Sequence, residues 1–249
     1  MLPDVFRLDG KLAMVTGAGN PLAHAVGVAF AEAGADIVAV SHRPEAAQAL
    51  AAAAGALGRK ATAVTADMTR AAEVRRATDE ALTQHGAIDV LLLGDEAVVA
   101  APLADLEEDA WDTVMAVNAK SVYLGAKTVG AHMVARGRGR IIVLAHGLAV
   151  AGVPNTAVYA ASKGAAVQFA RGLGLEWATT GVTVNAIAPG WFAGAWETDL
   201  VDPLARFVPM RRRGRPEELG PLAVYLASDV AAYVTASLTI IDGGQICHA

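Results

Sequence analysis

Three polar side chains lie close together between Gly139 and Ala166, and their types predict proton-transfer chemistry. Tyr159 and Lys163 are four residues apart, so on a helix both side chains project from one face. An ammonium beside a phenol favours the ionised phenol, which makes Tyr159 a usable acid or base near neutral pH. His146, thirteen residues before Tyr159, ends an apolar run and can polarise a carbonyl or act as a second acid or base. The alternative is a structural histidine hydrogen-bonded at a strand end.

A turn that contains glycines follows the first apolar run and is typical of a phosphate-binding site. The segment TGAGNPLAHAVGVAFAEAGADIVAV reads as a turn, a helix and a strand. Gly17 and Gly19 let the backbone approach a pyrophosphate, and the following helix offers amide groups. Pro21 lacks an N–H but suits a first helical turn, so we expect the amides of Leu22 and Ala23 to face a phosphate. A merely structural turn is the alternative.

The end of the second apolar run bears on the choice between NADP and NAD. No Asp or Glu occupies Val40 to Arg43, where a carboxylate would hold the ribose hydroxyls of NAD. His42 and Arg43 stand there instead, and a basic side chain can pair with a 2′-phosphate. This favours NADP, although a solvent-exposed loop arginine explains the same residues.

Apolar segments of strand length alternate with alanine-rich segments of helical length along the whole chain. Several apolar segments lack polar alternation, as in IDVLLLG and GRIIVLA, which is typical of strands covered on both faces. We therefore predict an α/β fold, a doubly wound parallel sheet in a single domain over residues 1–249 with helices on both faces. We expect left-handed helix stops at Gly34, Gly86, Gly139 and Gly181. The irregular segment at about 190–216 reads as a substrate loop or lid.

Composition excludes several function classes. A net charge of -5 and a pI near 5.7 argue against a nucleic-acid partner, and Arg211 to Arg213 read as a solvated loop. The single cysteine, Cys247, excludes an intrachain disulfide and favours a reducing, cytoplasmic location. Gly147 and Pro154 interrupt the uncharged run 141–162, so we expect no membrane span there. The N-terminus has no pattern of a secretory signal, and we expect no metal site.

Several motifs, taken in order, resemble the short-chain dehydrogenase/reductase family over nearly the whole chain, from Lys11 to Gly244. They are Thr16-Gly17, Asp67 in TADMT, Asn118 in VMAVNAKSV, Tyr159 with Lys163, NAIAPG, RPEELGPLAVYLASD and IIDGG. The resemblance implies a Rossmann-like fold and four catalytic residues, Asn118, His146, Tyr159 and Lys163. It implies that Lys163 also holds the nicotinamide ribose and that Asn118 organises a water chain. The implied cofactor contacts are Gly17, Gly19, Asn20, Leu22, His42, Arg43, Asp67, Met68, Gly94, Tyr159, Lys163, Pro189, Gly190 and Phe192.

Three departures from the family pattern bear on this chemistry. His146 stands where the family has a serine that hydrogen-bonds the substrate oxygen. Leu93, Gly94, Asp95 and Glu96 replace Asn-Asn-Ala-Gly, and carboxylates near a pyrophosphate are unfavourable unless they point to solvent. Gly194 replaces a threonine that binds the nicotinamide carboxamide, and Thr198 is a substitute only if the loop shifts.

The sequence as a whole predicts an NAD(P)-dependent oxidoreductase, with NADP favoured, that moves hydride between nicotinamide and a carbonyl or alcohol carbon beside Tyr159. A bulky apolar small molecule is the expected substrate, because the segment 190–216 contains Trp191, Phe192, Trp196, Phe207 and Met210. One alternative is a redox-neutral lyase, isomerase, dehydratase or cyclase that uses His146 and Tyr159. Another is a catalytically silent protein of the same fold. The resemblance also implies a homo-oligomer, a tetramer or a dimer, assembled through the helices that carry Asn118 and Tyr159.

Overall fold

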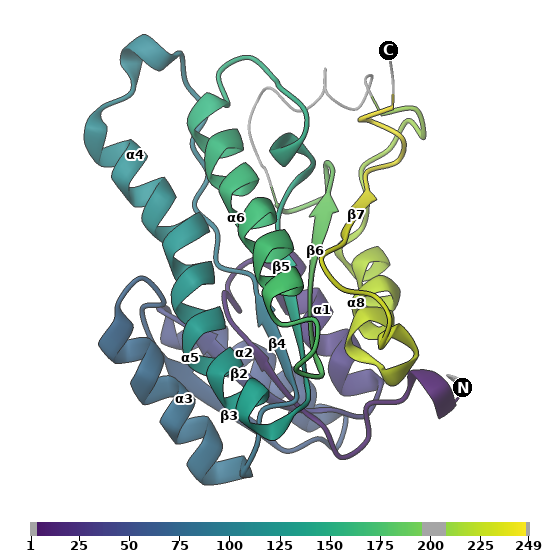
Figure 1. Cartoon of the computed structure of the whole chain (residues 1–249). Coiled ribbons are helices and arrows are strands. Elements are labelled where there is room, and N and C mark those ends of the chain that lie inside the picture. The colour runs from purple at the N-terminus through teal and green to yellow at the C-terminus, as the bar shows by residue number, and fades with distance from the viewer. Residues whose placement is uncertain (1–3, 196–207, 248–249) are drawn as a thin grey trace.

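One parallel sheet of seven strands forms the centre of the computed structural model, which describes residues 4–195 and 208–247. The strand order is β3-β2-β1-β4-β5-β6-β7, and every pairing is parallel. The strands are β1 (Leu12–Val15), β2 (Asp36–Ser41), β3 (Ala61–Thr65), β4 (Val90–Leu93), β5 (Gly139–Leu144), β6 (Val182–Pro189) and β7 (Leu238–Ile241). The predicted doubly wound sheet is confirmed (Figure 1).

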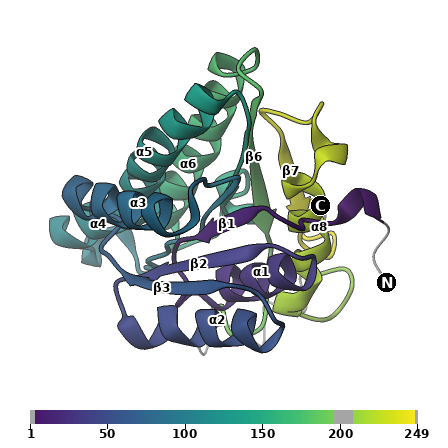
Figure 2. The ribbon, with the colours of Figure 1, turned by 90° about the horizontal axis from the view of Figure 1, so that it is seen from below.

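Helices cover both faces of the sheet, as the unbroken apolar strands require. Figure 2 shows one layer on each side. The layer on one face consists of α1 (Pro21–Glu32), α2 (Pro44–Ala56) and α8 (Gly220–Ala227). The other layer consists of α3 (Ala71–His85), α4 (Glu108–Met115), α5 (Ser121–Arg136) and α6 (Ala157–Glu176). Successive residues of β1 alternate between the two apolar cores, and all four are buried, so this strand is covered on both sides.

The strand order reverses between β1 and β4, and this reversal creates the site. The chain leaves β1 toward α1 on one face and leaves β4 toward α4 on the other. In such sheets a crevice opens at the carboxyl ends of the two central strands. The loops after β1 and β4 therefore meet, and they carry Gly17, Asn20, Asp95 and Glu96.

Two of the four expected left-handed helix stops are confirmed, at Gly34 and Gly86, where the φ angles are 113° and 82°. Gly181 is left-handed, with a φ of 81°, but α6 has already ended at Glu176, so this glycine forms the turn before β6. The expectation for Gly139 is wrong, because α5 ends two residues earlier, at Gly137, whose φ is 71°. Gly139 instead begins β5, and a Cβ there would collide with the side chain of Met133.

The long uncharged run 141–162 is a strand, a loop and the start of a helix. It covers most of β5, a 3-10 turn at Gly147–Ala149 and the first residues of α6. Within the two described stretches, no helix combines the length and the apolar character that crossing a bilayer needs.

Candidate active site

A crevice of about 430 Å³ lies at the carboxyl ends of β1 to β4, at the point where the strand order reverses. The turn after β1 lines it, the loops after β2 and β3 form its far end, and Glu96, which contacts Tyr159, lies at its other end. Most of the expected cofactor residues from the first two-fifths of the chain line it. The lining residues are Gly17, Gly19, Asn20, Pro21, Ser41, His42, Arg43, Asp67, Met68, Thr69, Asp95, Glu96, Ala97, Val98, Val117 and Ala195.

The turn after β1 is closely packed against the loop after β4. Gly17 has a φ of 66°, and a Cβ there would overlap the carbonyl of Gly94, so only glycine fits. Asn20 is the N-cap of α1, with Pro21 in the first turn as expected. The side-chain oxygen of Asn20 accepts the Leu22 amide at 2.9 Å. The Leu22 amide is therefore already paired, contrary to the expectation that it faces a phosphate.

Basic and acidic groups at the far end of the crevice come from the loops after β2 and β3. The Arg43 guanidinium donates to the Gly19 carbonyl at 3.0 Å and so lies across the glycine turn. Asp67 accepts hydrogen bonds from the amide and hydroxyl of Thr69 and from Arg70. Burial opposes ionisation of Asp67, but these bonds outweigh burial and lower the pKa of its carboxyl.

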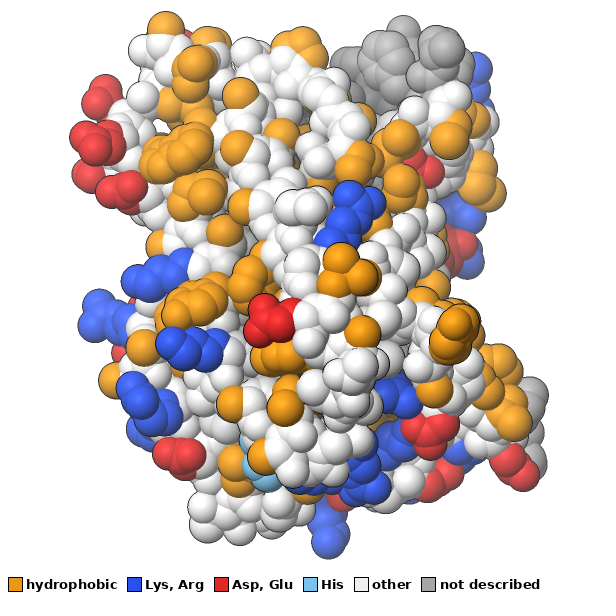
Figure 3. Space-filling model, viewed as in Figure 1, with side chains coloured by type: hydrophobic (Ala, Val, Ile, Leu, Met, Phe, Trp, Pro, Cys, Tyr) orange, Lys and Arg blue, Asp and Glu red, His pale blue; other side chains and the backbone are white. Residues whose placement is uncertain are grey.

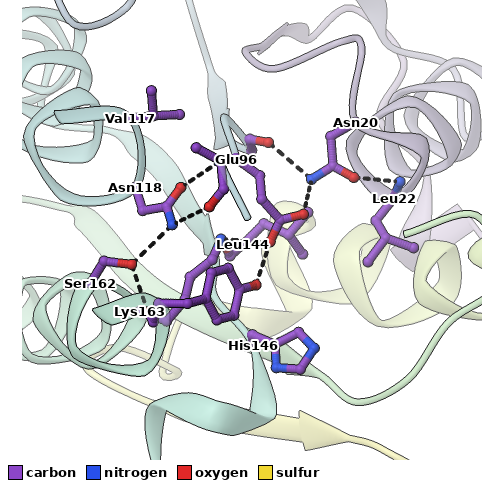
Figure 4. A network of polar contacts seen from close by, with 12 residues as sticks. Asn20, Leu22, Glu96, Val117, Asn118, Leu144, His146, Ser162 and Lys163 are labelled. Atoms are coloured by element: carbon purple, nitrogen blue, oxygen red, sulfur yellow. Dashed lines mark hydrogen bonds and ion pairs between the residues drawn. The ribbon is translucent and has the colours of Figure 1, made fainter. Parts of the chain in front are cut away.

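Tyr159 and Lys163 meet at the catalytic end, as the helical spacing predicts, and both contact the Glu96 carboxylate (Figure 4). The Tyr159 hydroxyl donates to Oε1 of Glu96 at 2.5 Å, and Nζ of Lys163 lies 3.0 Å from the same oxygen. Oε2 of Glu96 accepts from Nδ2 of Asn20 at 3.3 Å. Glu96 thus connects the N-terminus of α1 to the tyrosine and lysine of α6.

Glu96 is buried and charged. Its side chain is 10% exposed, and that of Lys163 is 2% exposed. Burial alone would raise the pKa of Glu96, but the Lys163 ammonium and the hydrogen bond from Tyr159 outweigh it, so the pKa is lowered. The lysine charge that the proposed chemistry needs is therefore neutralised by a carboxylate in this structure.

Asp95 is a second carboxylate in the crevice, and its negative charge has fewer stabilising partners than that of Glu96. Thr16 hydrogen-bonds the carboxylate, but Oδ2 has no hydrogen-bond partner among the described residues and is buried. Burial raises the pKa of Asp95 to about 6, against the hydrogen bond from Thr16 and the nearby His42. Neither carboxylate points to solvent: Asp95 lies at the glycine turn, and Glu96 reaches the catalytic pair.

His146 lies against the catalytic tyrosine, at the end of β5. Its ring packs edge to face against Tyr159 and Trp191, with centroid distances of 5.5 and 5.4 Å. Nδ1 accepts the Leu148 amide at 3.1 Å. Burial lowers the pKa of His146 to about 4, although Glu96 opposes the shift. The ring is therefore neutral at pH 7 with its proton on Nε2, so it is an N–H donor, as a serine hydroxyl is a donor.

Asn118 holds the loop that carries Glu96. It lies in a π-helical turn, Ala116–Lys120, between α4 and α5. Its side chain accepts the Ala97 amide and donates to the Ala97 carbonyl, both at 2.8 Å. Nδ2 also donates at 2.9 Å to Ser162, whose hydroxyl donates to the Tyr159 carbonyl at 2.7 Å. Ser162 is part of this network, and sequence reasoning did not single it out.

Seven expected cofactor residues do not line the crevice: Leu22, Gly94, Tyr159, Lys163, Pro189, Gly190 and Phe192. Tyr159 and Lys163 reach it only through Glu96. Gly94 lies directly beneath Gly17, and the Gly190 amide donates to the Ile241 carbonyl at 2.9 Å. Phe192 is buried against Gly214. Pro189, the last residue of β6, pairs with Ile241 of β7. Thr198, Trp196 and Phe207 lie outside the described residues, and the role of 190–216 as a lid stays a prediction.

The buried carboxylate of Asp95, with Oδ2 lacking a hydrogen-bond partner among the described residues, leads to a prediction about stability. Its pKa is raised, so the folded state holds a proton that the unfolded state releases, and ionisation costs stability as the pH rises past about 6. We expect Asp95→Asn to raise the free energy of unfolding by up to about 3 kcal/mol at about pH 7.5, and by little at about pH 4. Urea unfolding at the two pH values measures this. Asp105→Asn, at an exposed position, is the control, and an equal gain at both pH values would contradict the assignment.

Comparison with known proteins shows similarity over nearly the full length of this chain. A family model described as Enoyl-(Acyl carrier protein) reductase matches residues 17–245. D-threitol dehydrogenase of Mycolicibacterium smegmatis is 35% identical over 244 residues, which cover 96% of this chain and 94% of that protein. Galactitol 2-dehydrogenase (L-tagatose-forming) of Cereibacter sphaeroides is 38% identical over 251 residues and 96% of each chain.

Solved structures agree with this similarity. A gluconate 5-dehydrogenase from Burkholderia cenocepacia, in complex with NADP and tartrate, superposes with a TM-score of 0.94 at 35% identity and 99% coverage of both chains. A short-chain type dehydrogenase/reductase from Mycobacterium marinum gives a TM-score of 0.91 at 32% identity and 98% coverage of both. This chain belongs to the short-chain dehydrogenase/reductase family of oxidoreductases.

Proposed function

We propose that this protein is an NADP-dependent oxidoreductase that interconverts a secondary alcohol and a ketone, with Tyr159 as the acid/base. The observation that carries the proposal is the position of Tyr159 and Lys163, which both contact Glu96, a residue that lines the same crevice as the glycine turn after β1. A crevice at the switch point of a parallel sheet suits a dinucleotide, and a phenol beside an ammonium suits proton transfer at a substrate oxygen.

The residues of the crevice fit NADP. Gly17 and Gly19 line the crevice, so the turn after β1 presents residues without side chains there. His42 and Arg43 line the end where a 2′-phosphate would be held, and Asp67 with Met68 lines the place of the adenine. NADP is bound in the Burkholderia cenocepacia relative. The cofactor, when bound, supplies or accepts the hydride; the residues around Tyr159 manage the proton.

His146 has a definite role in this proposal. The neutral ring, with its proton on Nε2, donates a hydrogen bond to the substrate oxygen in place of the serine of relatives. Donors of this kind stabilise the negative charge that develops on oxygen during hydride transfer. Tyr159 exchanges the proton with the same oxygen, and Asn118 positions the loop beside it.

The substrate proposed is an apolar secondary alcohol or ketone. A cluster of hydrophobic side chains packs with Tyr159: Leu148, Trp191 and Val208 are buried beside it, and Val99 and Val153 are partly buried. Several relatives are named as dehydrogenases of polyols or sugar acids, such as D-threitol dehydrogenase and gluconate 5-dehydrogenase. These hydrophobic side chains offer the hydroxyls of a polyol few partners, which favours an apolar carbon skeleton here.

A homo-oligomer is also proposed, built through the layer of α4, α5 and α6. Hydrophobic side chains are exposed over this layer (Figure 3), among them Trp111 on α4 and Tyr123 on α5. Apolar patches of this kind are typical of surfaces that are covered by a partner.

Substrate class can be tested with a panel of alcohols and NADP⁺. We expect kcat/KM for apolar cyclic secondary alcohols to exceed that for four- to six-carbon polyols by about tenfold or more, because each buried methylene contributes about 0.8 kcal/mol. The measurement is NADPH formation at 340 nm, with NAD⁺ in parallel. A preference for polyols would contradict the apolar assignment. Binding of neither cofactor would favour a redox-neutral reaction by His146 and Tyr159.

The role of Tyr159 is tested by Tyr159→Phe. We expect kcat to fall by about 10²–10⁴-fold, because the phenylalanine ring fills the same space but carries no exchangeable proton. NADPH affinity and the melting temperature should remain close to wild type, measured by fluorescence titration and thermal unfolding. Retained turnover would remove Tyr159 from the mechanism.

Two amides distinguish a substrate donor from a structural histidine at position 146. Gln places an amide nitrogen near the position of Nε2, whereas Asn places an amide oxygen near the position of Nδ1 that accepts the Leu148 amide. We expect His146→Asn to lose about 10²–10³-fold in kcat and His146→Gln to lose less. The opposite order would show that the hydrogen bond to Leu148 is the only role of the ring.

The pH dependence of kcat in the wild-type enzyme is a further test of His146. A plot of kcat against pH should show no inflection from His146 near pH 6.5, since the pKa of this histidine is about 4.

A further inference from the structure

The Glu96 side chain lies between the two ends of the crevice (Figure 4). One oxygen bonds Asn20 at the N-terminus of α1, and the other bonds Tyr159 and Lys163 of α6. Among the described residues, neither oxygen hydrogen-bonds or ion-pairs with His42, Arg43, Asp67 or Met68, which line the far end of the crevice. The Glu96 carboxylate therefore engages the polar groups at the catalytic end of the crevice and makes no contact with the polar groups at the other end.

We propose that Glu96 divides the cofactor site into an adenosine half that is open and a nicotinamide half that stays closed until Glu96 releases Lys163. The proposal rests on the NADP-dependent function proposed above. It makes Glu96 a specificity-determining residue: ligands that need only the adenosine half bind without displacing it, and ligands that need Lys163 bind only when it has moved.

Charge is the first argument. The Lys163 ammonium donates to Glu96 at 3.0 Å and to the Leu144 carbonyl at 3.4 Å, so two of its three N–H donors are in use and its charge is neutralised by Glu96 before any ribose hydroxyl arrives. A Glu96 carboxylate near the α1 N-terminus also repels a pyrophosphate, together with Asp95 in the same loop. Both effects lower the affinity for NADP as long as the Glu96 side chain keeps its contacts with Asn20, Tyr159 and Lys163.

The second argument is that the side chain can move without the loop. Asn118 holds both the amide and the carbonyl of Ala97, the next residue, at 2.8 Å. The main chain of the loop is therefore fixed by bonds that do not involve the Glu96 side chain. Rotation about the side-chain bonds of Glu96 breaks its contacts with Asn20, Tyr159 and Lys163 and leaves the loop and the Asn118 network intact.

The third argument comes from the family pattern. Glu96 stands at the glycine of the Asn-Asn-Ala-Gly segment. A glycine has no side chain that could reach Lys163, so the division is specific to chains that carry a long acidic side chain at this position.

Isothermal titration calorimetry with two probes, 2′,5′-ADP and NADPH, tests the proposal. The variants are Glu96→Ala, which removes the side chain, and Glu96→Gln, which keeps its shape and removes its charge. We expect Glu96→Ala to bind NADPH about tenfold or more tightly than wild type, because the state in which residue 96 blocks Lys163 no longer exists and no longer lowers the apparent affinity. We expect the affinity for 2′,5′-ADP to stay within about twofold in both variants. Glu96→Gln should shift NADPH affinity in the same direction by less.

Glu107→Gln is the matched control, since Glu107 is an exposed glutamate at the start of α4, outside the crevice lining. It should change neither affinity. Equal gains for the two probes in the Glu96 variants, or an unchanged NADPH affinity, would overturn the division of the site. If Glu96→Ala does not fold, Glu96→Gln decides between these outcomes. Failure of every protein, wild type included, to bind 2′,5′-ADP would instead overturn the proposed NADP dependence.

Discussion

The contact of one carboxylate oxygen with both the Lys163 ammonium and the Tyr159 hydroxyl is the interaction on which the function of this site depends. Separation of a buried ion pair leaves a charge without a partner, which typically costs several kcal/mol. The lysine is almost wholly buried, so water cannot replace Glu96 readily. Any ligand that uses Lys163 must supply interactions that compensate for the loss. The identity of residue 96 thus affects cofactor binding and proton transfer together.

The fold explains why a residue after β4 can reach a helix far along the chain. Parallel strands place their carboxyl ends at one edge, and the reversal of strand order brings the loops after β1 and β4 into contact. The close approach of Gly17 and Gly94 fixes that contact, and the hydrogen bonds of Asn118 to Ala97 fix the loop against α5 and α6. Asn118 is thereby a positioning residue in addition to any part in a water chain.

Much of the architecture could be predicted from the sequence, because strands covered on both faces read as unbroken apolar runs. The pairing of Tyr159 with Lys163 also followed from helical spacing, since residues at i and i+4 share a face. The contact of Glu96 with Tyr159 and Lys163 could not be predicted, because residue spacing does not determine the direction of a loop side chain. The protonation state of His146 could not be predicted from the sequence either. Its tautomer depends on the hydrogen bond from the Leu148 amide, and its pKa depends on burial. The helix end predicted at Gly139 lies two residues too far along the chain, because Gly137 is the left-handed C-cap of α5.

The most direct measurement is a pair of crystal structures, one with 2′,5′-ADP and one with NADPH. With 2′,5′-ADP bound, we expect the Glu96 carboxylate to remain in contact with Lys163 and Tyr159, as in the present structure. With NADPH bound, we expect Glu96 to have left both groups and Lys163 to contact the ligand. A structure in which NADPH occupies the full crevice while Glu96 still contacts Lys163 and Tyr159 would contradict the central role of this carboxylate.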